Sequence, residues 1–143
     1  MKKLTKYVVG FLIQKDKSYV ALIEKARPVW QKGRFNGVGG HIEKGEIPLD
    51  AMRREFKEET DLVVRNWRHF ATLKHYSRGG LIYFFVALSD DIYKAITVTD
   101  EPIRIFHVDS LPEKVMPNLR WLIPMALDKK LTEPLEIIDR GNN

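Results

Sequence analysis

Apolar and polar positions along the chain predict strands interleaved with helices. Two β-prone apolar runs, 7–14 and 19–24, are separated by a polar tetrad and indicate a β-hairpin. A loop is expected over 25–34. The glycine-rich segment 35–40 is typical of a short strand that breaks into a loop. Further strands are expected over 67–76, 81–89 and 103–108.

Two segments carry helical periodicity. Residues 48–60 contain no glycine and show an i, i+3, i+4, i+7 pattern, with Pro48 suited to the first turn. Residues 118–130 predict a second helix, in which Asn118 can serve as the cap and Pro124 would cost a hydrogen bond or a kink. We therefore expect an α+β fold, an α/β/α sandwich whose mixed sheet is flanked by helices. No repeat or linker interrupts the sequence, so residues 1–143 are expected to form a single domain.

Composition narrows the class of protein. The chain has 143 residues, 44% hydrophobic and 30% charged, which is normal for one globular domain. The longest apolar run, 81–88, is too short to cross a bilayer, so no membrane partner is expected. The apolar stretch 7–13 lacks the cleavage site of a signal peptide, which leads us to expect a cytoplasmic location. Cysteine is absent, which excludes thiolate metal sites and cysteine nucleophiles.

Positive charge is concentrated at the N-terminal end. Residues 1–35 carry nine basic and two acidic side chains, a net charge of +7, in a chain whose total is +5. Such a segment indicates a polyanionic partner, either nucleic acid or the phosphates of a small ligand. A solvated basic surface explains it equally well.

Three carboxylates share one side of the predicted helix 48–60. At about 100° per residue, Glu55, Glu58 and Glu59 fall within an arc of about 100° beside the apolar stripe. Hard oxygen ligands clustered in this way suit Mg²⁺ or Mn²⁺. Arg54 precedes Glu58 by four residues and could orient it. Taken alone, however, the helix is explained better by an acidic, solvent-exposed face.

The segment before the helix changes this balance. Glu46 follows Gly40 after five residues, and seven more lead to the run Arg-Glu-Phe-Lys-Glu-Glu-Thr-Asp-Leu at 54–62. The spacing resembles the Nudix box, G-x5-E-x7-R-E-U-x-E-E-x-G-U with U a bulky apolar residue, and eight of its nine specified positions match. Asp61 replaces the last glycine, which would lie past the helix end in a left-handed conformation. We expect a cost of about 1 kcal/mol or less.

Resemblance to the Nudix hydrolase superfamily implies hydrolysis of a nucleoside diphosphate linked to another moiety, with Mg²⁺ or Mn²⁺ as cofactor. Matched by position, Glu58 and Glu59 would be the main metal ligands, and Glu55 a ligand or the base that activates water. Arg54 would orient Glu55 or Glu58, and the Gly40 carbonyl could also bind metal. These residues are the expected catalytic and metal-binding set.

Supporting residues follow from the same resemblance. Gly39 and Glu46 would be structural residues of the motif, with Glu46 bracing the loop. Many family members add an acid from outside the box, for which Glu101 is the first candidate and Asp100 the second. An ordinary polar turn before Pro102 explains this acidic pair equally well.

The flanking sequence resembles the MutT-like branch of the family. Residues 33–40 are similar to that branch's approach to the box, and residues 105–112 to its last strand and turn. The branch cleaves nucleoside triphosphates, including oxidised purine nucleotides of the 8-oxo-dGTP type, to a monophosphate and pyrophosphate. By this resemblance Asn36 and Asn118 would read the base, since an amide offers both a donor and an acceptor. A turn residue and a helix cap are the plainer explanations.

Basic and aromatic side chains near the loop could hold the rest of a nucleotide. Lys25, Arg27 and Arg34 flank the segment that leads into the box and could bind the triphosphate, the arginines in bidentate fashion. Three aromatic residues could stack on a base or belong to the core, namely Trp30, Phe35 and Trp121.

Rival functions stay open at this point. The box does not distinguish nucleoside triphosphates from ADP-ribose, dinucleoside polyphosphates or RNA 5′ ends. A non-catalytic nucleotide-sensing or RNA-binding module is the alternative from another class, although the presence of all four box glutamates favours catalysis. A nucleotide is therefore the expected partner, and nucleic acid is expected only as an RNA 5′ end. The sequence does not distinguish a monomer from a homodimer.

Overall fold

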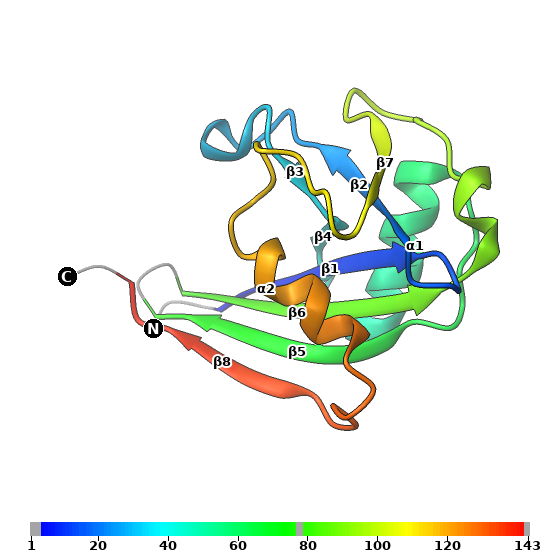
Figure 1. Cartoon of the computed structure of the whole chain (residues 1–143). Helices are drawn as coiled ribbons and strands as arrows, with labels where there is room; N and C mark the ends of the chain where they lie inside the picture. The colour runs from blue at the N-terminus through cyan, green and yellow to red at the C-terminus, as the bar shows by residue number, and fades with distance from the viewer. Residues whose placement is uncertain (1–3, 77–78, 142–143) are drawn as a thin grey trace.

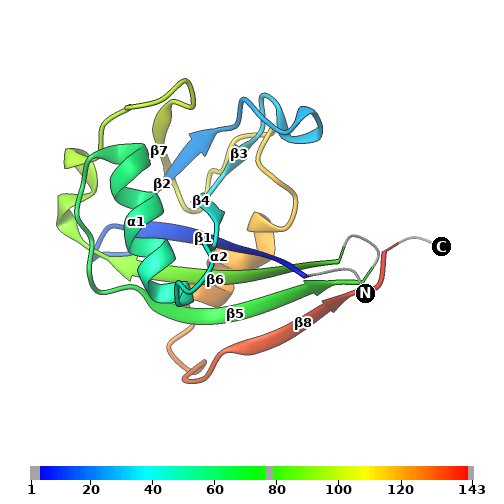
Figure 2. The same cartoon turned by 180° about the vertical axis from the view of Figure 1, so that it is seen from behind.

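A computed structural model describes residues 4–76 and 79–141. Within them a mixed sheet is covered by one long helix on each face, α2 in front in Figure 1 and α1 in front in Figure 2. Two 3-10 helices, η1 (Val29–Gln31) and η2 (Asp90–Lys94), lie in connections. The other elements are β1 (Thr5–Ile13), β2 (Tyr19–Glu24), β3 (Phe35–Asn36), β4 (Val38–His41), α1 (Pro48–Thr60), β5 (Arg68–His75), β6 (Gly80–Leu88), β7 (Ile103–His107), α2 (Leu119–Leu127) and β8 (Leu135–Asp139).

The sheet is built around two central strands. Its order is β3-β2-β1-β6-β5-β8, with β4 paired to β1 and β7 paired to β2. The pairs β1–β6 and β5–β8 are parallel, and the other pairs are antiparallel. One end of β1 pairs with β2 at Leu12 and Ile13, while its earlier part pairs with β4 over Tyr7 to Gly10. The sheet therefore opens between β2 and β4, and β4 lies beside α1 (Figure 2).

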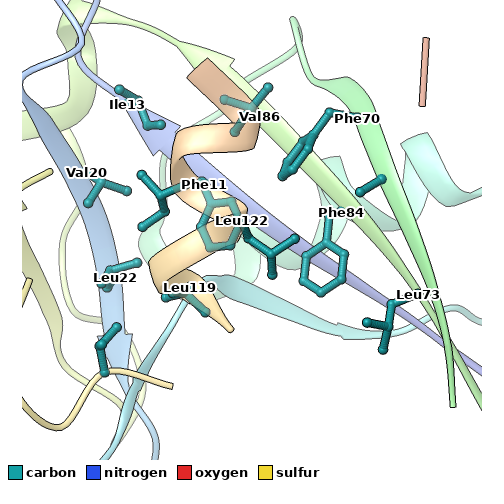
Figure 3. Close-up of a cluster of buried hydrophobic side chains, with 14 residues drawn as sticks. Phe11, Ile13, Val20, Leu22, Phe70, Leu73, Phe84, Val86, Leu119 and Leu122 are labelled. Atoms are coloured by element: carbon teal, nitrogen blue, oxygen red, sulfur yellow. The ribbon is translucent and has the colours of Figure 1, made fainter. Parts of the chain in front are cut away.

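Each helix buries its apolar stripe against its own face of the sheet. On the α1 face, Met52 and Phe56 are fully buried and pack with Val8 and Leu12 of β1. Gly10 leaves room for this packing, since a Cβ there would lie 2.6 Å from the Met52 Cε atom. On the α2 face, a second cluster packs Leu119 and Leu122 against strand residues such as Phe11, Leu22, Phe70 and Phe84 (Figure 3).

Most of the expected elements are confirmed. The hairpin, the mixed sheet and the helix over 48–60 are present, and Pro48 occupies the first helical position. The second helix is shorter than expected and ends at Leu127, where Asp128 adopts an extended backbone. A cationic side chain of β5 reaches one of its last carbonyls, since Arg68 donates to Ala126 O. No helix in the described ranges is long and apolar enough to span a membrane.

Candidate active site

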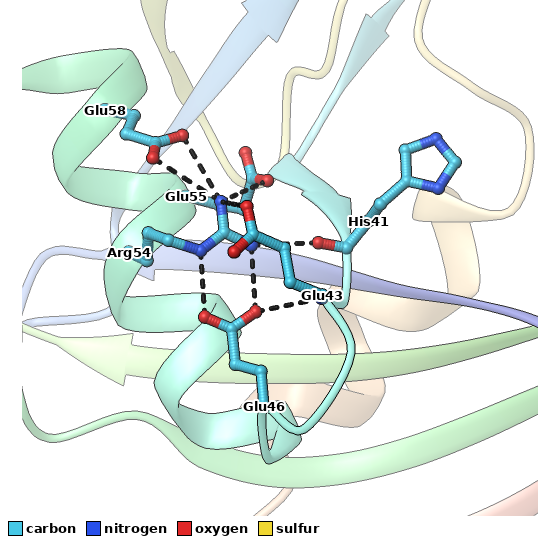
Figure 4. A network of polar contacts seen from close by, with 6 residues as sticks. All are labelled: His41, Glu43, Glu46, Arg54, Glu55 and Glu58. Carbon is cyan, nitrogen blue, oxygen red and sulfur yellow. Dashed lines mark hydrogen bonds and ion pairs between the residues drawn. The ribbon is translucent and has the colours of Figure 1, made fainter.

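One guanidinium organises the loop before α1 and the acidic side of α1. Arg54 donates through Nε and Nη2 to both carboxylate oxygens of Glu46, at 2.8 and 2.9 Å (Figure 4). Its Nη1 atom lies 2.9 Å from Glu55 Oε1 and 3.3 Å from Glu58 Oε2. Nη2 also donates to the His41 carbonyl at 2.9 Å. The loop, the end of β4 and two carboxylates of the helix are thus held by a single side chain.

Glu46 holds the loop in turn. Besides its bidentate pair with Arg54, its Oε1 atom accepts a hydrogen bond from the Glu43 backbone N–H at 3.1 Å. The guanidinium beside it lowers the pKa of Glu46, and the carboxylates raise the pKa of Arg54. Both groups therefore stay charged over a wide pH range and fix the shape of the loop.

The two glycines of β4 are required by close contacts. A Cβ on Gly39 would lie 1.9 Å from the Val8 carbonyl oxygen. A Cβ on Gly40 would lie 2.5 Å from the Glu55 carboxyl carbon. The Glu55 side chain is only 13% exposed, and burial, the largest effect, raises its pKa despite the hydrogen bond from Arg54. The backbone of β4 therefore forms one wall around this carboxylate.

The remaining acid of the box is linked through a hydroxyl group to the acid that was predicted from outside the box. Glu59 accepts a hydrogen bond from Thr99 Oγ1 at 2.9 Å, and the same hydroxyl accepts one from the Glu101 backbone N–H at 3.1 Å. Glu101 itself is buried, with its carboxylate bonded to the Ala26 N–H at 2.7 Å and paired with Lys25 Nζ at 3.3 Å. The structure thus connects Glu101 to Glu59 through Thr99, while its carboxylate braces the basic loop.

No group of three histidine, aspartate or glutamate side chains is arranged to hold a metal ion in the part of the chain that the structure describes. The box glutamates instead bond to neighbouring protein groups, Glu55 and Glu58 to Arg54 and Glu59 to Thr99. Glu58 is the most accessible of the Arg54 partners on the helix, with 56% of its side chain exposed.

The predicted phosphate-binding cations lie on the loop above this site. Arg27 pairs with Asp100, and this carboxylate raises the pKa of Arg27, to which Glu101 and Glu59 also contribute. Lys25 forms an ion pair with Glu101. Arg34 is exposed, and its backbone bonds to Lys25 across the loop. The loop thus brings positive charge within electrostatic reach of the box acids.

A pocket of about 570 Å³ lies on the α2 face of the sheet. It contains both predicted base readers, Asn36 from β3 and Asn118 at the start of α2. Asn36 is close to the box along the chain, since only residues 37–39 separate it from Gly40. The other lining residues are Val9, Trp30, Gln31, His75, Ile82, Phe84, Met116, Pro117, Asp139 and Gly141.

The two asparagines differ in how their amides are used. Asn36 donates through Nδ2 to Gln31 Oε1 at 3.2 Å and accepts from the Gly37 N–H at 2.8 Å. Asn118 occupies the N-cap position of α2, but the expectation that it caps the helix is wrong, since its side chain makes no cap hydrogen bond. Its backbone is itself helical there, and its Oδ1 atom is buried with no partner among the described residues. An unused acceptor therefore lies at the pocket wall.

The three candidate stacking residues are distributed differently. Trp30 is half exposed and lines the pocket. Phe35 instead packs edge-on against Phe106, with ring centroids 4.9 Å apart, at the margin of the core. Trp121 is also partly exposed but is not among the pocket-lining residues. Of the three, Trp30 is thus the one that lines the pocket.

Sequence reasoning missed three polar residues of the pocket. Gln31 lies in the expected loop, His75 was given no role, and Asp139 belongs to β8, an element absent from the predicted set. The alternation of Leu135, Glu136 and Ile137 was the available signal for β8, but it is short. His75 and Asp139 pair across adjacent strands, a contact that no local pattern reveals.

Comparison with known proteins agrees with this arrangement. The family model of the NUDIX domain matches residues 3–132. Over 84 residues the chain is 30% identical to the 8-oxo-dGTP diphosphatase of Buchnera aphidicola subsp. Schizaphis graminum (strain Sg), which covers 59% of this chain and 63% of that protein. The match thus spans less than two thirds of the length of this curated relative.

Solved structures share the fold. A MutT NUDIX hydrolase from Burkholderia pseudomallei is similar with a TM-score of 0.73 and 17% identity, over 87% of this chain and 98% of its own. The NUDIX domain of Shewanella oneidensis NrtR, solved in complex with ADP ribose, is similar with a TM-score of 0.71 and 20% identity, over 88% of each chain. With a family match over nearly the whole chain, a complete set of box glutamates and this fold, the protein belongs to the Nudix hydrolase family.

Proposed function

We propose that this protein hydrolyses a nucleoside triphosphate, with oxidised purine nucleotides of the 8-oxo-dGTP type as favoured substrates, to a nucleoside monophosphate and pyrophosphate. The observation that carries the proposal is the short stretch of chain between a nucleoside-sized pocket and the box glutamates. Asn36 lines the pocket, Gly40 lies against Glu55, and only three residues separate Asn36 from Gly40 along the chain. The curated relative described as an 8-oxo-dGTP diphosphatase supports the same substrate class. A free nucleotide also agrees with the cytoplasmic location expected from the sequence.

The donor types of the box fit a hard divalent cation, although among the described residues these carboxylates bond to Arg54 and Thr99 and no three of them surround one point. Glu55, Glu58 and Glu59 offer carboxylate oxygens from neighbouring turns of α1, and the Gly40 backbone closes against the first of them. Oxygen donors of this kind are those that Mg²⁺ and Mn²⁺ prefer. Glu58 and Glu59 would be the principal ligands, with Glu55 and the Gly40 carbonyl as further donors. When bound, the metal neutralises charge on the phosphate oxygens and makes a water molecule more acidic.

The chain's own groups would position the reactants around these ligands. Arg54 holds Glu55 and Glu58 near one another through Nη1. Glu55, confined between Arg54 and Gly40, would accept the proton of the attacking water at a carboxylate oxygen. Arg27 and Arg34 on the basic loop would hold the phosphates, while Lys25 supports this loop through its pair with Glu101.

The pocket would bind the nucleoside through its amide groups and one indole. The buried Oδ1 of Asn118, which has no partner among the described residues, would accept a hydrogen bond from an N–H group of the base. Asn36 would present its amide from β3, held by Gln31 and Gly37. Trp30 would stack on the base, as an aromatic side chain at the pocket wall can. A purine lacking a donor toward Asn118 would leave this acceptor unpaired and would bind less well.

The proposal is tested by phosphate and pyrophosphate release with Mg²⁺ or Mn²⁺ across a substrate panel. The panel holds canonical and oxidised nucleoside triphosphates, ADP-ribose, a dinucleoside polyphosphate and 5′-triphosphate RNA. Glu58→Gln is compared with Glu113→Gln, the same change at an exposed glutamate outside the site. We expect metal-dependent release that Glu58→Gln abolishes and Glu113→Gln retains. Turnover of none of the triphosphates by the folded protein would refute the proposal.

A further inference from the structure

The strand β8 forms one edge of the sheet. It pairs in parallel with β5, from Ala71 opposite Leu135 to His75 opposite Asp139 (Figure 1). It also lies beyond residues 3–132, the span matched by the family model. The part of the pocket that β8 supplies, Asp139 and the following Gly141, is therefore built by residues outside the matched span.

A contact between an imidazole and a carboxylate joins β8 to β5 at this wall. His75 Nδ1 lies 3.0 Å from Asp139 Oδ2, and both residues line the pocket. The other carboxylate oxygen of Asp139 accepts a hydrogen bond from the Gly141 N–H at 2.8 Å. A carboxylate at Nδ1 fixes the ring orientation and the position of a proton on this nitrogen. Nε2 is then the ring atom left to bond to a ligand.

The two cationic side chains next to this pair in the sequence lie over an aromatic ring instead. Lys74 Nζ lies 5.1 Å and the Arg140 guanidinium carbon 5.7 Å from the ring centroid of Tyr76. Both cations thus have an aromatic partner of their own, while Asp139 contacts His75 and Gly141. The His75 side chain is 23% exposed, so it is partly withdrawn from solvent at the pocket wall.

Besides Asn118 at the start of α2, polar side chains reach the pocket from both edges of the sheet. Gln31 and Asn36 come from the side of β3, one edge of the sheet, and His75 and Asp139 come from the side of β8, the other edge. Between them the floor is apolar, with Val9, Ile82 and Phe84. A ligand that fills the pocket would therefore meet hydrogen-bonding groups at both ends.

We propose that His75, oriented by Asp139 of β8, is a specificity-determining residue that accepts a hydrogen bond from a donor group of the bound nucleoside. The inference rests on the proposed function, because it takes the pocket to be the nucleoside site. Asp139 acts through His75 as a positioning residue. The donor is a sugar hydroxyl or an N–H group of the base, and the choice of substrates separates the two.

The test compares His75→Leu, Asp139→Ala and Asp139→Asn with the unaltered protein. Ile138→Ala is the matched control, since this residue lies on β8 beside Asp139, is half exposed and does not line the pocket. Steady-state kinetics are measured with ribo-, deoxy- and dideoxynucleotides and with guanine and hypoxanthine nucleotides. Binding of the nucleoside monophosphate without metal is measured by calorimetry, and folding by urea unfolding.

We expect His75→Leu to raise KM and the monophosphate Kd about tenfold, with kcat within about twofold, because one buried hydrogen bond is lost. Asp139→Ala should show part of this effect, while Asp139→Asn and Ile138→Ala should stay close to the unaltered protein. The effect should vanish for the substrate that lacks the donor. Unchanged KM and Kd in both His75→Leu and Asp139→Ala, with nucleotide turnover intact, would overturn the inference alone. Absence of nucleotide turnover and binding in the unaltered protein would refute the proposed function, and the inference with it.

Discussion

Gly40 and the carboxylate of Glu55 lie in direct contact, and a Cβ on residue 40 would lie 2.5 Å from the Glu55 carboxyl carbon. Gly40 of β4 thus sets the position of a carboxylate on α1, although the two belong to different elements. This contact explains why the motif needs its first glycine, since any side chain there would displace the acid. It also allows stability and activity to be separated by mutation.

Gly40→Ala should therefore reduce activity far more than stability. The displaced group is the flexible end of a glutamate, so the unfolding free energy should fall by only about 1 kcal/mol. A misplaced acid should lower kcat about 100-fold. Gly80→Ala is the control, because a Cβ there would meet its nearest neighbour at an ordinary 3.8 Å. Full activity of Gly40→Ala in nucleotide hydrolysis would contradict this role.

Arg54→Lys should disconnect the loop from the helix. A lysine cannot reproduce the fork that binds both oxygens of Glu46 and also reaches Glu55 and the His41 carbonyl. We expect a loss of about 1–3 kcal/mol in unfolding free energy, because partly buried charged groups lose partners. Urea unfolding measures this loss. Arg65→Lys, at an exposed arginine outside this network, should change it by less than about 0.5 kcal/mol, and equal losses in both variants would refute the assignment.

Glu46→Gln should destabilise the protein in a pH-dependent manner. Since Arg54 lowers the pKa of Glu46 in the folded state, the stabilisation is fully present above the ordinary glutamate range. It is lost as pH falls through the lowered pKa. The variant should therefore be less stable than the unaltered protein at pH 7, and the difference should shrink toward pH 3. Glu43→Gln, at a 68% exposed side chain of the same loop, should show little difference at either pH.

Asp61→Gly should stabilise the helix end. Asp61 has φ 58 and ψ 16, so the left-handed conformation expected from the motif is confirmed. Glycine adopts this conformation without the steric cost, and we expect a gain of about 0.5–1 kcal/mol. The exposed pair of Asp61 with Lys57 offsets little of this gain. Thermal unfolding should rank Gly above Asp and Asp above Ala at this position, and a loss of stability in Asp61→Gly would be inconsistent with the account.

Asn118→Ala should weaken nucleotide binding with little effect on folding. A true cap residue would cost about 1 kcal/mol when replaced by alanine. Asn118 makes no such bond and leaves Oδ1 unpaired, so the change in unfolding free energy should stay within about 0.5 kcal/mol. KM for purine nucleotides should rise about tenfold. A large stability loss with unchanged KM would instead assign Asn118 to the helix.

The sequence predicts the local part of this site well. Gly40, Glu46 and the acids of 54–59 lie within twenty positions of one another, and helical periodicity places Glu55, Glu58 and Glu59 on one side of α1. The motif also includes Arg54. Its side-chain contacts lie within this same segment, and none reaches further along the chain than the His41 carbonyl. Short-range spacing therefore sufficed for the loop, the helix and its bracing pair.

Contacts between residues far apart in the chain could not be predicted from the sequence. Lys25 is expected to hold phosphate, and its pairing with Glu101, which lies 76 positions away, is a contact that the sequence does not reveal. The His75–Asp139 pair depends on β8, whose pairing with β5 joins distant segments. Asn118 was taken more readily as a cap because only the packed structure shows its oxygen buried and unbonded. These features arise from tertiary packing, which leaves no periodic signal in the chain.

The most direct test of the proposed hydrolysis is the identity of its products. Phosphorus NMR would follow 8-oxo-dGTP incubated with Mg²⁺ and the protein, beside the Glu58→Gln variant. Signals of the nucleoside monophosphate and pyrophosphate should appear together, and they should be absent with Glu58→Gln or with chelator. Formation of the diphosphate and orthophosphate, or no reaction of any nucleoside triphosphate, would contradict the account.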